Sequence, residues 1–413
     1  MAACDNVNVL VIGAGPSGAI AAALLARQGY SVSVFEKDTF PRFSIGESLL
    51  PQCMQYIEEA GMIDAVRAAG FQHKNGAAFM HKERYAEIDF RQKFTQGWDT
   101  TYQVDRAHFD KILADEAQRM GADIHYGYEV LAVDVSGEKS HVTYRDPAGE
   151  SHSLEAGFLL DASGFGRVLP RLLDLNTPSE FPVRHAVFTH ITDNINSDWF
   201  DREKILVSLH PQDRDVWTWL IPFSNGRASI GIVAREEFFS KFNGEPVQQL
   251  KAILAKDERL SELLNKADFD TEVRTITGYS SNVKSLHGKN YALLGNAGEF
   301  LDPIFSSGVT IGMRSASMAA ALMDRQFKGE TINWEADFSR PLMVGINSFR
   351  TFVTAWYDRR FQDIIFYDKQ LDEIKAKISS ILAGYAWDED NPYVKYSERR
   401  LNVLADICQQ GEN

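Results

Sequence analysis

The sequence predicts an α/β fold in which a nucleotide-binding domain is joined to an antiparallel sheet and a helical C-terminal region. Three observations predict it. The chain starts with an apolar strand, a glycine turn and a helix, continues with short strands between turns from about 175 to 275, and is largely helical in pattern from Val309 onward. A chain of 413 residues is long enough for two closely joined domains.

The first element is a buried parallel strand over residues 9–12, because this run is apolar, largely β-branched and ends in glycine. Strong helix formers follow over 19–25, and a second strand covers 31–36. The turn between the first strand and the helix consists of Gly13, Ala14, Gly15, Pro16, Ser17 and Gly18. A glycine run in this position is typical of a dinucleotide site.

Each part of this turn has a physical role in holding a dinucleotide. Gly13 permits the tight turn, Gly15 lets the backbone approach a pyrophosphate, and Gly18 lets the helix and strand pack closely. The amides at the start of the helix face the phosphate charge. Glu36 lies where an acidic side chain accepts hydrogen bonds from the adenosine ribose. The segment therefore predicts a Rossmann-like domain.

Alternating elements follow this first unit. Asp105 is the expected N-cap of a helix that runs to about Met120. The other expected elements are a helix over 52–69 and strands over 77–90, 124–135, 141–145 and 158–161. Further on, the antiparallel sheet is expected to contain strands over 187–191, 205–209, 216–221 and 228–233. Asn225-Gly226 between two of these runs is a hairpin signal.

These elements suggest a division of the chain into interleaved segments. The nucleotide-binding domain is expected to comprise residues 1–75, 99–174 and 276–325. The substrate domain is expected to comprise the strands of 76–98 and the sheet of 175–275, and 326–413 form the helical C-terminal region.

Composition narrows the classes of function. A net charge of -14 makes generic nucleic-acid binding an unfavourable interpretation. Cys4, Cys53 and Cys408 are too few and too scattered for a disulfide framework, and no metal site is expected. Since the sequence has neither a signal-peptide pattern nor an apolar run long enough to span a bilayer, we expect a cytoplasmic protein without integral membrane association.

Three later segments favour FAD over NAD as the dinucleotide. They are Arg106 at a helix start, the strand-end turn 161–164, and the run 295–303, which is followed by 306–308 and a helix. A helix N-terminus at the last position can present amides to a flavin. The order of all three segments behind a dinucleotide turn predicts FAD as the cofactor.

With these motifs in view, the chain resembles the flavin-dependent halogenases, within the flavoprotein monooxygenases that share one fold, over nearly its whole length. The most specific match is 217–222, which fits the pattern W-x-W-x-I-P at every fixed position. Residues 42–51 resemble the family's Gly-Glu-Ser/Ala-x-x-Pro segment, and 305–309 resemble its flavin and halide loop. Residues 384–392 resemble the C-terminal part of carrier-type and phenol-type halogenases.

The resemblance implies a domain like that of p-hydroxybenzoate hydroxylase and an enzyme that uses reduced FAD, O2 and halide on an electron-rich aromatic substrate, free or carrier-tethered. Hypohalous acid would travel through the protein to a lysine, and the matching position is Lys74. Halide would lie on the amides of Ser307 and Gly308. The substrate-pocket residues implied are Trp217, Trp219 and Ile221.

The turn, the later segments and the resemblance together give a set of cofactor-binding candidates. They are Gly13, Gly15, Pro16, Ser17, Gly18, Glu36, Lys37, Arg42, Ser48, Arg106, Asp161, Gly164, Asn296, Asp302, Gly308 and Val309. Two positions depart from the family: Asn296 stands where Asp is usual, and Gly76-Ala77 where paired glycines are common. Because the sequence has one dinucleotide turn, a separate flavin reductase is expected to supply the reduced flavin.

Plainer interpretations stay open for several residues. Two tryptophans at i and i+2 on one strand face can be ordinary core, and a lysine among polar residues can be a solvated loop charge. The aromatic residues of 349–367 fall at helical spacing, which favours helix core over a substrate wall. Arg359 and Arg360 are either solvated or meet a carrier protein.

Other activities on the same scaffold also stay open. They are a flavin-dependent reductase or dehydrogenase of the geranylgeranyl-reductase type, an FAD-dependent aromatic hydroxylase, and a flavin-bound protein without turnover.

Overall fold

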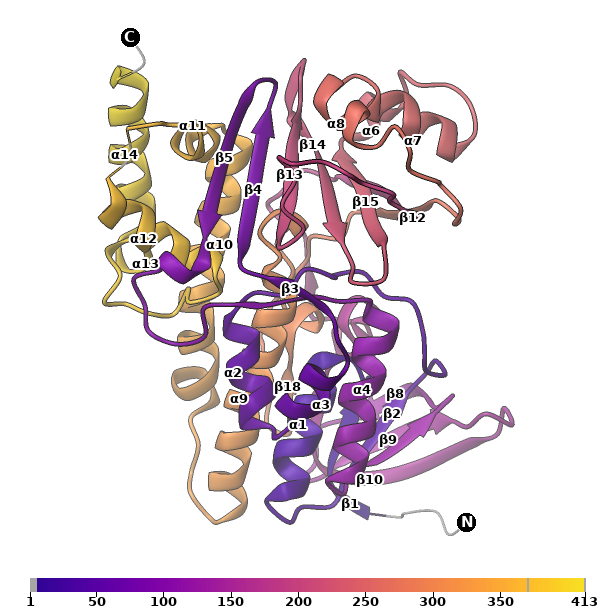
Figure 1. Ribbon diagram of the computed structural model, residues 1–413. Coiled ribbons are helices and arrows are strands. Elements are labelled where there is room, and N and C mark those ends of the chain that lie inside the picture. The colour runs from indigo at the N-terminus through magenta and orange to yellow at the C-terminus, as the bar shows by residue number, and fades with distance from the viewer. Residues whose placement is uncertain (1–5, 370, 412–413) are drawn as a thin grey trace.

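The computed structural model describes residues 6–369 and 371–411, and its two large sheets lie one above the other with helices around them (Figure 1). The lower sheet in this view is largely parallel and the upper one largely antiparallel, which confirms the predicted α/β class. Among the described residues, no helix has the combination of length and apolar character that crossing a bilayer requires.

The first sheet has the order β7-β2-β1-β10-β9-β8, and β18 pairs with the C-terminal end of β10. Strands β7, β2, β1, β10 and β18 are parallel, whereas β10, β9 and β8 pair antiparallel. The bounds are β1 (Asn6–Ile12), β2 (Val32–Glu36), β7 (Asp123–Tyr126), β8 (Glu129–Asp134), β9 (Ser140–Arg145), β10 (Ser151–Asp161) and β18 (Tyr291–Leu293). The carboxyl ends of the parallel strands therefore meet at one edge.

Helix α1 packs between α4 and α9 beside this sheet. Its buried face is rich in alanine, which lets neighbouring helices approach closely. The helices of this part of the chain are α1 (Pro16–Arg27), α2 (Gln52–Glu59), α3 (Ile63–Ala68), α4 (Arg106–Arg119), α5 (Val168–Leu172) and α9 (Ser307–Phe327). As predicted, Asp105 caps α4, and its carboxylate accepts from the Ala107 amide over 3.0 Å.

The second sheet has the order β16-β12-β15-β14-β13-β4-β5. All neighbours are antiparallel except β13 and β4. Its strands are β4 (Gly76–His81), β5 (Arg84–Asp89), β12 (His185–Thr192), β13 (Lys204–His210), β14 (Asp213–Pro222), β15 (Arg227–Ala234) and β16 (Arg274–Thr277). Two short ladders join β3 (Gln72–Lys74) to β6 (Thr101–Gln103) and β11 (Asn176–Thr177) to β17 (Asn282–Val283).

The two faces of the second sheet carry separate apolar cores. Ala77 and Phe79 of β4 belong to a core shared with the first sheet and the C-terminal helices, whereas Ala78 and Met80 belong to a core on the opposite face. This division follows from the alternation of side chains along a strand. It places the Trp217 face toward the first sheet.

Each face is covered by helices. The outer face carries α6 (Glu236–Phe239), α7 (Pro246–Leu254) and α8 (Glu258–Leu263), and the inner face meets α10 (Arg340–Tyr357), α11 (Arg360–Ile365), α12 (Asp372–Leu382), α13 (Pro392–Lys395) and α14 (Ser397–Gly411). Phe349, Phe352 and Trp356 of α10 are fully buried, in agreement with the core interpretation of the C-terminal aromatic residues.

Some expected boundaries need correction. The strand expected over 77–90 is the hairpin β4–β5, which turns at Lys82 with a φ of 55°. The strand expected over 124–135 is two strands, because Gly127 turns the chain with a φ of 79°. Helices α6–α8 were not expected within 175–275, although the capping box of Glu245 and Gln248 marks the start of α7.

Candidate functional site

A cavity of about 490 Å³ lies between the two sheets, and we call it the main cavity. Its wall includes residues at or just after the carboxyl ends of β1, β2 and β10, together with inward-facing residues of β14. The sequence-predicted residues that line it are Gly13, Gly15, Pro16, Ser17, Glu36, Lys37, Arg42, Ser48, Arg106, Gly164, Trp217, Trp219, Ile221, Asn296, Asp302, Ser307, Gly308 and Val309. Residues up to 296 positions apart thus meet around one space.

The glycine turn has the geometry that the sequence predicts. Gly13 has a φ of +96°, and a Cβ there would lie 2.7 Å from the Ala162 carbonyl oxygen. A Cβ on Gly18 would lie 1.9 Å from the Gly13 oxygen, so this glycine serves helix packing and does not line the main cavity. At Gly15 the nearest protein atom to such a Cβ is Arg42 Nη2 at 3.5 Å, so the turn itself leaves room on the cavity side.

Glu36 ends β2 and its carboxylate is tied to the turn. It accepts from the Ala14 amide over 2.9 Å and from the Asp38 amide over 3.0 Å. Arg42 Nη2 lies 3.4 Å from Glu36 Oε2, and Arg42 Nη1 lies 3.2 Å from Asp110 Oδ2. The acidic group expected at the ribose position is therefore held in place, at the wall of the main cavity.

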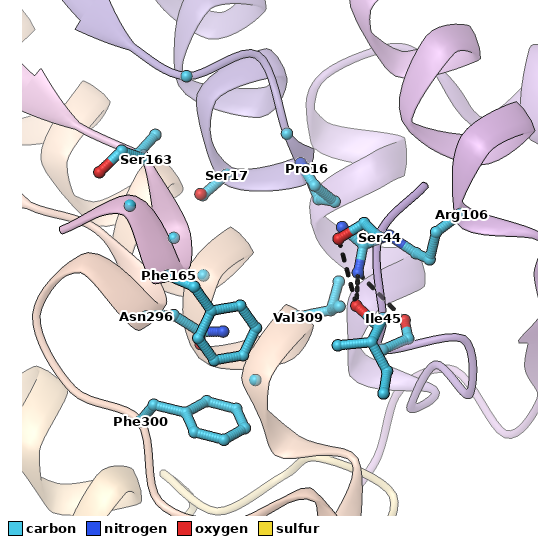
Figure 2. A pocket seen from close by; sticks show the side chains of 18 of the residues that line it. Pro16, Ser17, Ser44, Ile45, Arg106, Ser163, Phe165, Asn296, Phe300 and Val309 are labelled. Atoms are coloured by element: carbon cyan, nitrogen blue, oxygen red, sulfur yellow. Dashed lines mark hydrogen bonds between the residues drawn. The ribbon is translucent and has the colours of Figure 1, made fainter. Parts of the chain in front are cut away.

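Arg106 contacts the backbone of the segment that leads to Ser48. Its guanidinium forms two hydrogen bonds to Asp110, of 2.7 and 3.0 Å. It also donates to the Ile45 carbonyl over 2.6 Å (Figure 2). A buried Arg–Asp pair that is joined by two hydrogen bonds has a well-defined geometry. Arg106 therefore lines the main cavity and also fixes the chain at 45–46.

Asp161 has a different role from the one expected. Its carboxylate accepts from the Ser163 amide over 2.9 Å and the Leu169 amide over 2.6 Å, and it does not line the main cavity. Burial raises the pKa of this carboxyl. Asp161 holds the turn that presents Ser163 and Gly164 to the cavity, so its support of a cofactor would be indirect and a direct contact stays a prediction.

The N-terminus of α9 points at the same space. Ser306 adopts a left-handed conformation with a φ of 54°, after which α9 starts at Ser307. Ser306, Ser307, Gly308 and Val309 all line the main cavity. The N-terminal end of this 21-residue helix directs its first backbone amides, and their positive potential, at the cavity.

Asn296 provides a test of whether a cofactor fits. Its side-chain oxygen is buried and has no hydrogen-bond partner among the described residues. An unpaired buried acceptor is costly, so it indicates a donor from a bound molecule, such as a ribityl hydroxyl. With the open space at Gly15 and the amides of α9, the wall fits a dinucleotide that carries a flavin.

Lys74 lies outside the main cavity, at the end of β3, and its side chain is 1 % exposed. The amine donates to Ser48 Oγ over 2.7 Å and to the Leu49 carbonyl over 2.8 Å. Burial lowers the pKa of Lys74 to about 7. The interpretation of Lys74 as a solvated loop charge is therefore wrong.

A second, small cavity of about 20 Å³ borders the Lys74 side chain, and we call it the Lys74 cavity. Its wall is otherwise largely apolar and consists of Leu50, Ala77, Phe79, Phe90, Ile205, Val207, Ile304, Phe305, Ser306 and Leu382. Ile205 and Ser306 line both cavities, so they form part of the partition between them. Its volume is close to that needed by one or two water molecules.

Trp217 and Trp219 are both core and cavity wall. Trp217 Nε1 donates to the Tyr357 hydroxyl over 3.0 Å, and Trp219 Nε1 donates to Ser229 Oγ over 3.0 Å. Both indoles are buried and line the main cavity. The two interpretations considered for this motif therefore do not exclude each other.

Sequence reasoning missed several cavity residues. Phe165 and Phe300 pack edge to face, with their ring centroids 5.1 Å apart, and both line the main cavity beside Asn296 (Figure 2). Glu47 also lines it and is paired with His190 of β12 at 2.5 Å. Glu47 stands inside the Gly-Glu-Ser run, which was a signal for it, whereas single phenylalanines in turns carry none.

Comparison with known proteins identifies several relatives. Residues 6–330 match the family model described as an FAD-binding domain. The flavin-dependent halogenase armH1 of Armillaria mellea is 30% identical over 94% of this chain and 75% of its own length. The 1H-pyrrole-2-carbonyl-[peptidyl-carrier protein] chlorinase of Pseudomonas fluorescens is 26% identical over 95% of this chain and 96% of its own length. The tryptophan 2-halogenase of Chondromyces crocatus is 30% identical over 79% of this chain, which spans 62% of that protein.

Two solved structures extend the comparison. A flavoprotein/dehydrogenase from Cytophaga hutchinsonii is 44% identical, with a TM-score of 0.95 over 99% of this chain and 100% of its own. The myxobacterial chondrochloren halogenase CndH is 26% identical, with a TM-score of 0.78 over 98% of this chain and 97% of its own.

Proposed function

Because this chain belongs to the FAD-binding domain family and is related to the flavin-dependent halogenases, we propose that it is a halogenase acting on an electron-rich aromatic substrate. It is an FAD-dependent oxidoreductase, and FAD is its cofactor. The observation that supports the halogenase proposal best is the Lys74 amine, which is buried, has its pKa lowered to about 7 by burial, and borders a small cavity that shares Ile205 and Ser306 with the main cavity.

Reduced FAD, together with O2 and halide, supplies hypohalous acid when bound in the main cavity. The amides at Ser307 and Gly308 hold the halide, because the N-terminus of α9 directs positive potential into that space. Ser306 and Ile205 lie between this site and Lys74. The apolar wall of the Lys74 cavity excludes competing nucleophiles.

Lys74 acts as the halogen acceptor. Its neutral amine attacks the halogen of hypohalous acid, a nitrogen–halogen bond forms as the halogen–oxygen bond breaks, and water leaves with one amine proton. The aromatic ring then takes the halogen, and its displaced proton returns to the amine. Burial lowers the pKa of Lys74 to about 7, which makes the neutral form accessible.

The substrate is proposed to be an aromatic ring, free or tethered to a carrier protein. A pyrrole on a peptidyl carrier protein is the substrate in the name of one relative. An aromatic ring is larger than the Lys74 cavity, so side chains of its wall would have to move to admit one. A separate reductase is proposed to supply the reduced flavin.

A second candidate is a flavin-dependent dehydrogenase or reductase. The solved structure with 44% identity bears the description flavoprotein/dehydrogenase. In that case substrate would react in the main cavity against the wall of Trp217 and Trp219, and Lys74 would have no chemical role. An aromatic hydroxylase is a third possibility on the same wall.

One experiment separates these functions. The purified protein is loaded with FAD and incubated with a flavin reductase, NADH, bromide or chloride, and a panel of phenols, pyrroles and indoles. A product with the halogen isotope pattern supports the proposal. Oxygen incorporation without halogen would indicate a hydroxylase, and loss of an alkene from an added lipid substrate would indicate a reductase.

A further inference from the structure

Tyr357, at the C-terminal end of α10, joins two side chains that line the main cavity. Its hydroxyl donates to Asp302 Oδ2 over 2.9 Å and accepts from Trp217 Nε1 over 3.0 Å. Trp217 belongs to β14 of the second sheet, whereas Asp302 precedes the segment that leads into α9. A single hydroxyl from the helical region therefore connects two walls of the cavity.

The orientation of the Tyr357 ring is fixed independently of these bonds. The Arg184 guanidinium stacks on the ring, 3.5 Å from its centroid. Arg184 is itself held by Asp215 through two hydrogen bonds of 2.8 Å. A cation on the ring face stabilises this arrangement. Burial raises the pKa of Tyr357 well above its usual value, so the hydroxyl keeps the proton that it donates.

Asp302 is enclosed by donors. Oδ1 accepts from the Ile304 amide over 3.0 Å, and the Tyr279 hydroxyl lies 3.5 Å from Oδ2. The titratable and charged groups that act on Asp302 are Tyr357 of α10, Tyr279 between β16 and β17, and Arg184 before β12. Burial raises the pKa of Asp302 to about 6, and the hydrogen bond from Tyr357 opposes that rise.

We propose that Tyr357 is a positioning residue of the main cavity, which orients the Trp217 indole and keeps the Asp302 carboxylate ionised at the entrance to α9. Without its hydroxyl, the indole loses its acceptor and the carboxylate loses a donor. Since both side chains line the cavity, this role holds whichever reaction the flavin carries out.

The test is a pH titration of the oxidised FAD-bound protein, followed by flavin absorption, in wild type and Tyr357→Phe. Phenylalanine keeps the ring under Arg184 and removes only the hydroxyl. Loss of a donor to the carboxylate should move the titration midpoint upward by about one pH unit. Tryptophan emission of the apoprotein should also change, because the Trp217 indole loses its acceptor.

Control variants make the outcome decisive. Tyr385→Phe removes a hydroxyl that donates to the Trp98 carbonyl, away from the main cavity, and should leave the midpoint in place. Asp302→Asn should abolish the transition. Trp217→Phe should keep the Tyr357–Asp302 bond and shift the midpoint less than Tyr357→Phe does. An unmoved midpoint in Tyr357→Phe, or a transition that persists in Asp302→Asn, would overturn the assignment. Neither readout requires halogenation, so failure here is distinct from failure of the halogenase proposal.

Discussion

Lys74 Nζ lies 2.7 Å from Ser48 Oγ, and the two residues face different cavities. Ser48 lines the main cavity, whereas Lys74 lines the small apolar one behind it. A serine hydroxyl can accept from an ammonium or donate to a neutral amine. Ser48 therefore offers a path by which a proton of Lys74 could reach the main cavity.

Replacement of Lys74 should separate flavin binding from halogenation. Lys74→Ala, and Lys74→Met as a variant that keeps side-chain volume, should retain stoichiometric FAD because the amine does not line the main cavity. Halogenation should fall at least about 100-fold, as expected when a covalent acceptor is lost. Absorption at the flavin maximum and product mass spectrometry measure the two effects.

Lys111→Ala is the matched control for that pair, because Lys111 is partly exposed on α4, pairs with Asp115 one turn along and does not line either cavity. It should halogenate like wild type. Unchanged halogenation in both Lys74 variants would remove the lysine from the mechanism.

The buried amine should also give stability a specific dependence on pH. Burial lowers the pKa of Lys74 from 10.5 to about 7, so the unfolded chain binds more protons than the folded one between these values. The contribution of Lys74 to the free energy of unfolding therefore becomes more favourable as pH rises from about 7 to about 10.5. Urea unfolding across this range should show the free energy of unfolding of wild type increasing with pH relative to that of Lys74→Met. Parallel curves would mean that the amine stays charged in the fold.

Substitutions at Gly15 and Gly18, two glycines of the same turn, should have different effects, one on FAD binding and the other on the stability of the fold. Gly15→Val should abolish FAD binding yet leave a folded protein, because the nearest protein atom to an added Cβ is 3.5 Å away. Gly18→Ala should destabilise the fold itself, by roughly 3 kcal/mol or more, since its Cβ would meet the Gly13 oxygen at 1.9 Å. Thermal unfolding and FAD titration of both variants check this. A Gly15→Val protein that purifies with stoichiometric flavin would contradict it.

Arg106 should stabilise the fold through Asp110. Arg106→Met leaves the buried Asp110 carboxylate with Arg42 as its remaining ion-pair partner. This substitution should lower the free energy of unfolding by about 3 kcal/mol. The double variant Arg106→Met/Asp110→Leu should recover much of that loss, because no unpaired charge stays buried. Equal destabilisation of the single and double variants in urea unfolding would show that the pair acts only through the bonds of Arg106 to the 45–46 carbonyls.

The dinucleotide turn could be predicted from the sequence because its causes are local. The strand, the glycines and the helix formers are consecutive, and the positive φ of Gly13 is a demand on one residue. The position of Glu36 follows from the length of one strand–helix–strand unit. The W-x-W-x-I-P run likewise fixed a strand with both indoles on one face.

Other properties of the site required the tertiary structure. Asp161 is predicted to contact the cofactor, whereas in the structure its carboxylate accepts the Ser163 and Leu169 amides and does not line the main cavity. The Tyr357 hydroxyl joins Trp217 and Asp302, which lie 140 and 55 positions away in the chain. The local strand–turn–helix motif determined by itself that this protein binds a dinucleotide. Packing of distant segments decided which side chains face it and how acidic they are, since burial and hydrogen-bond partners come from residues that the chain order does not bring together.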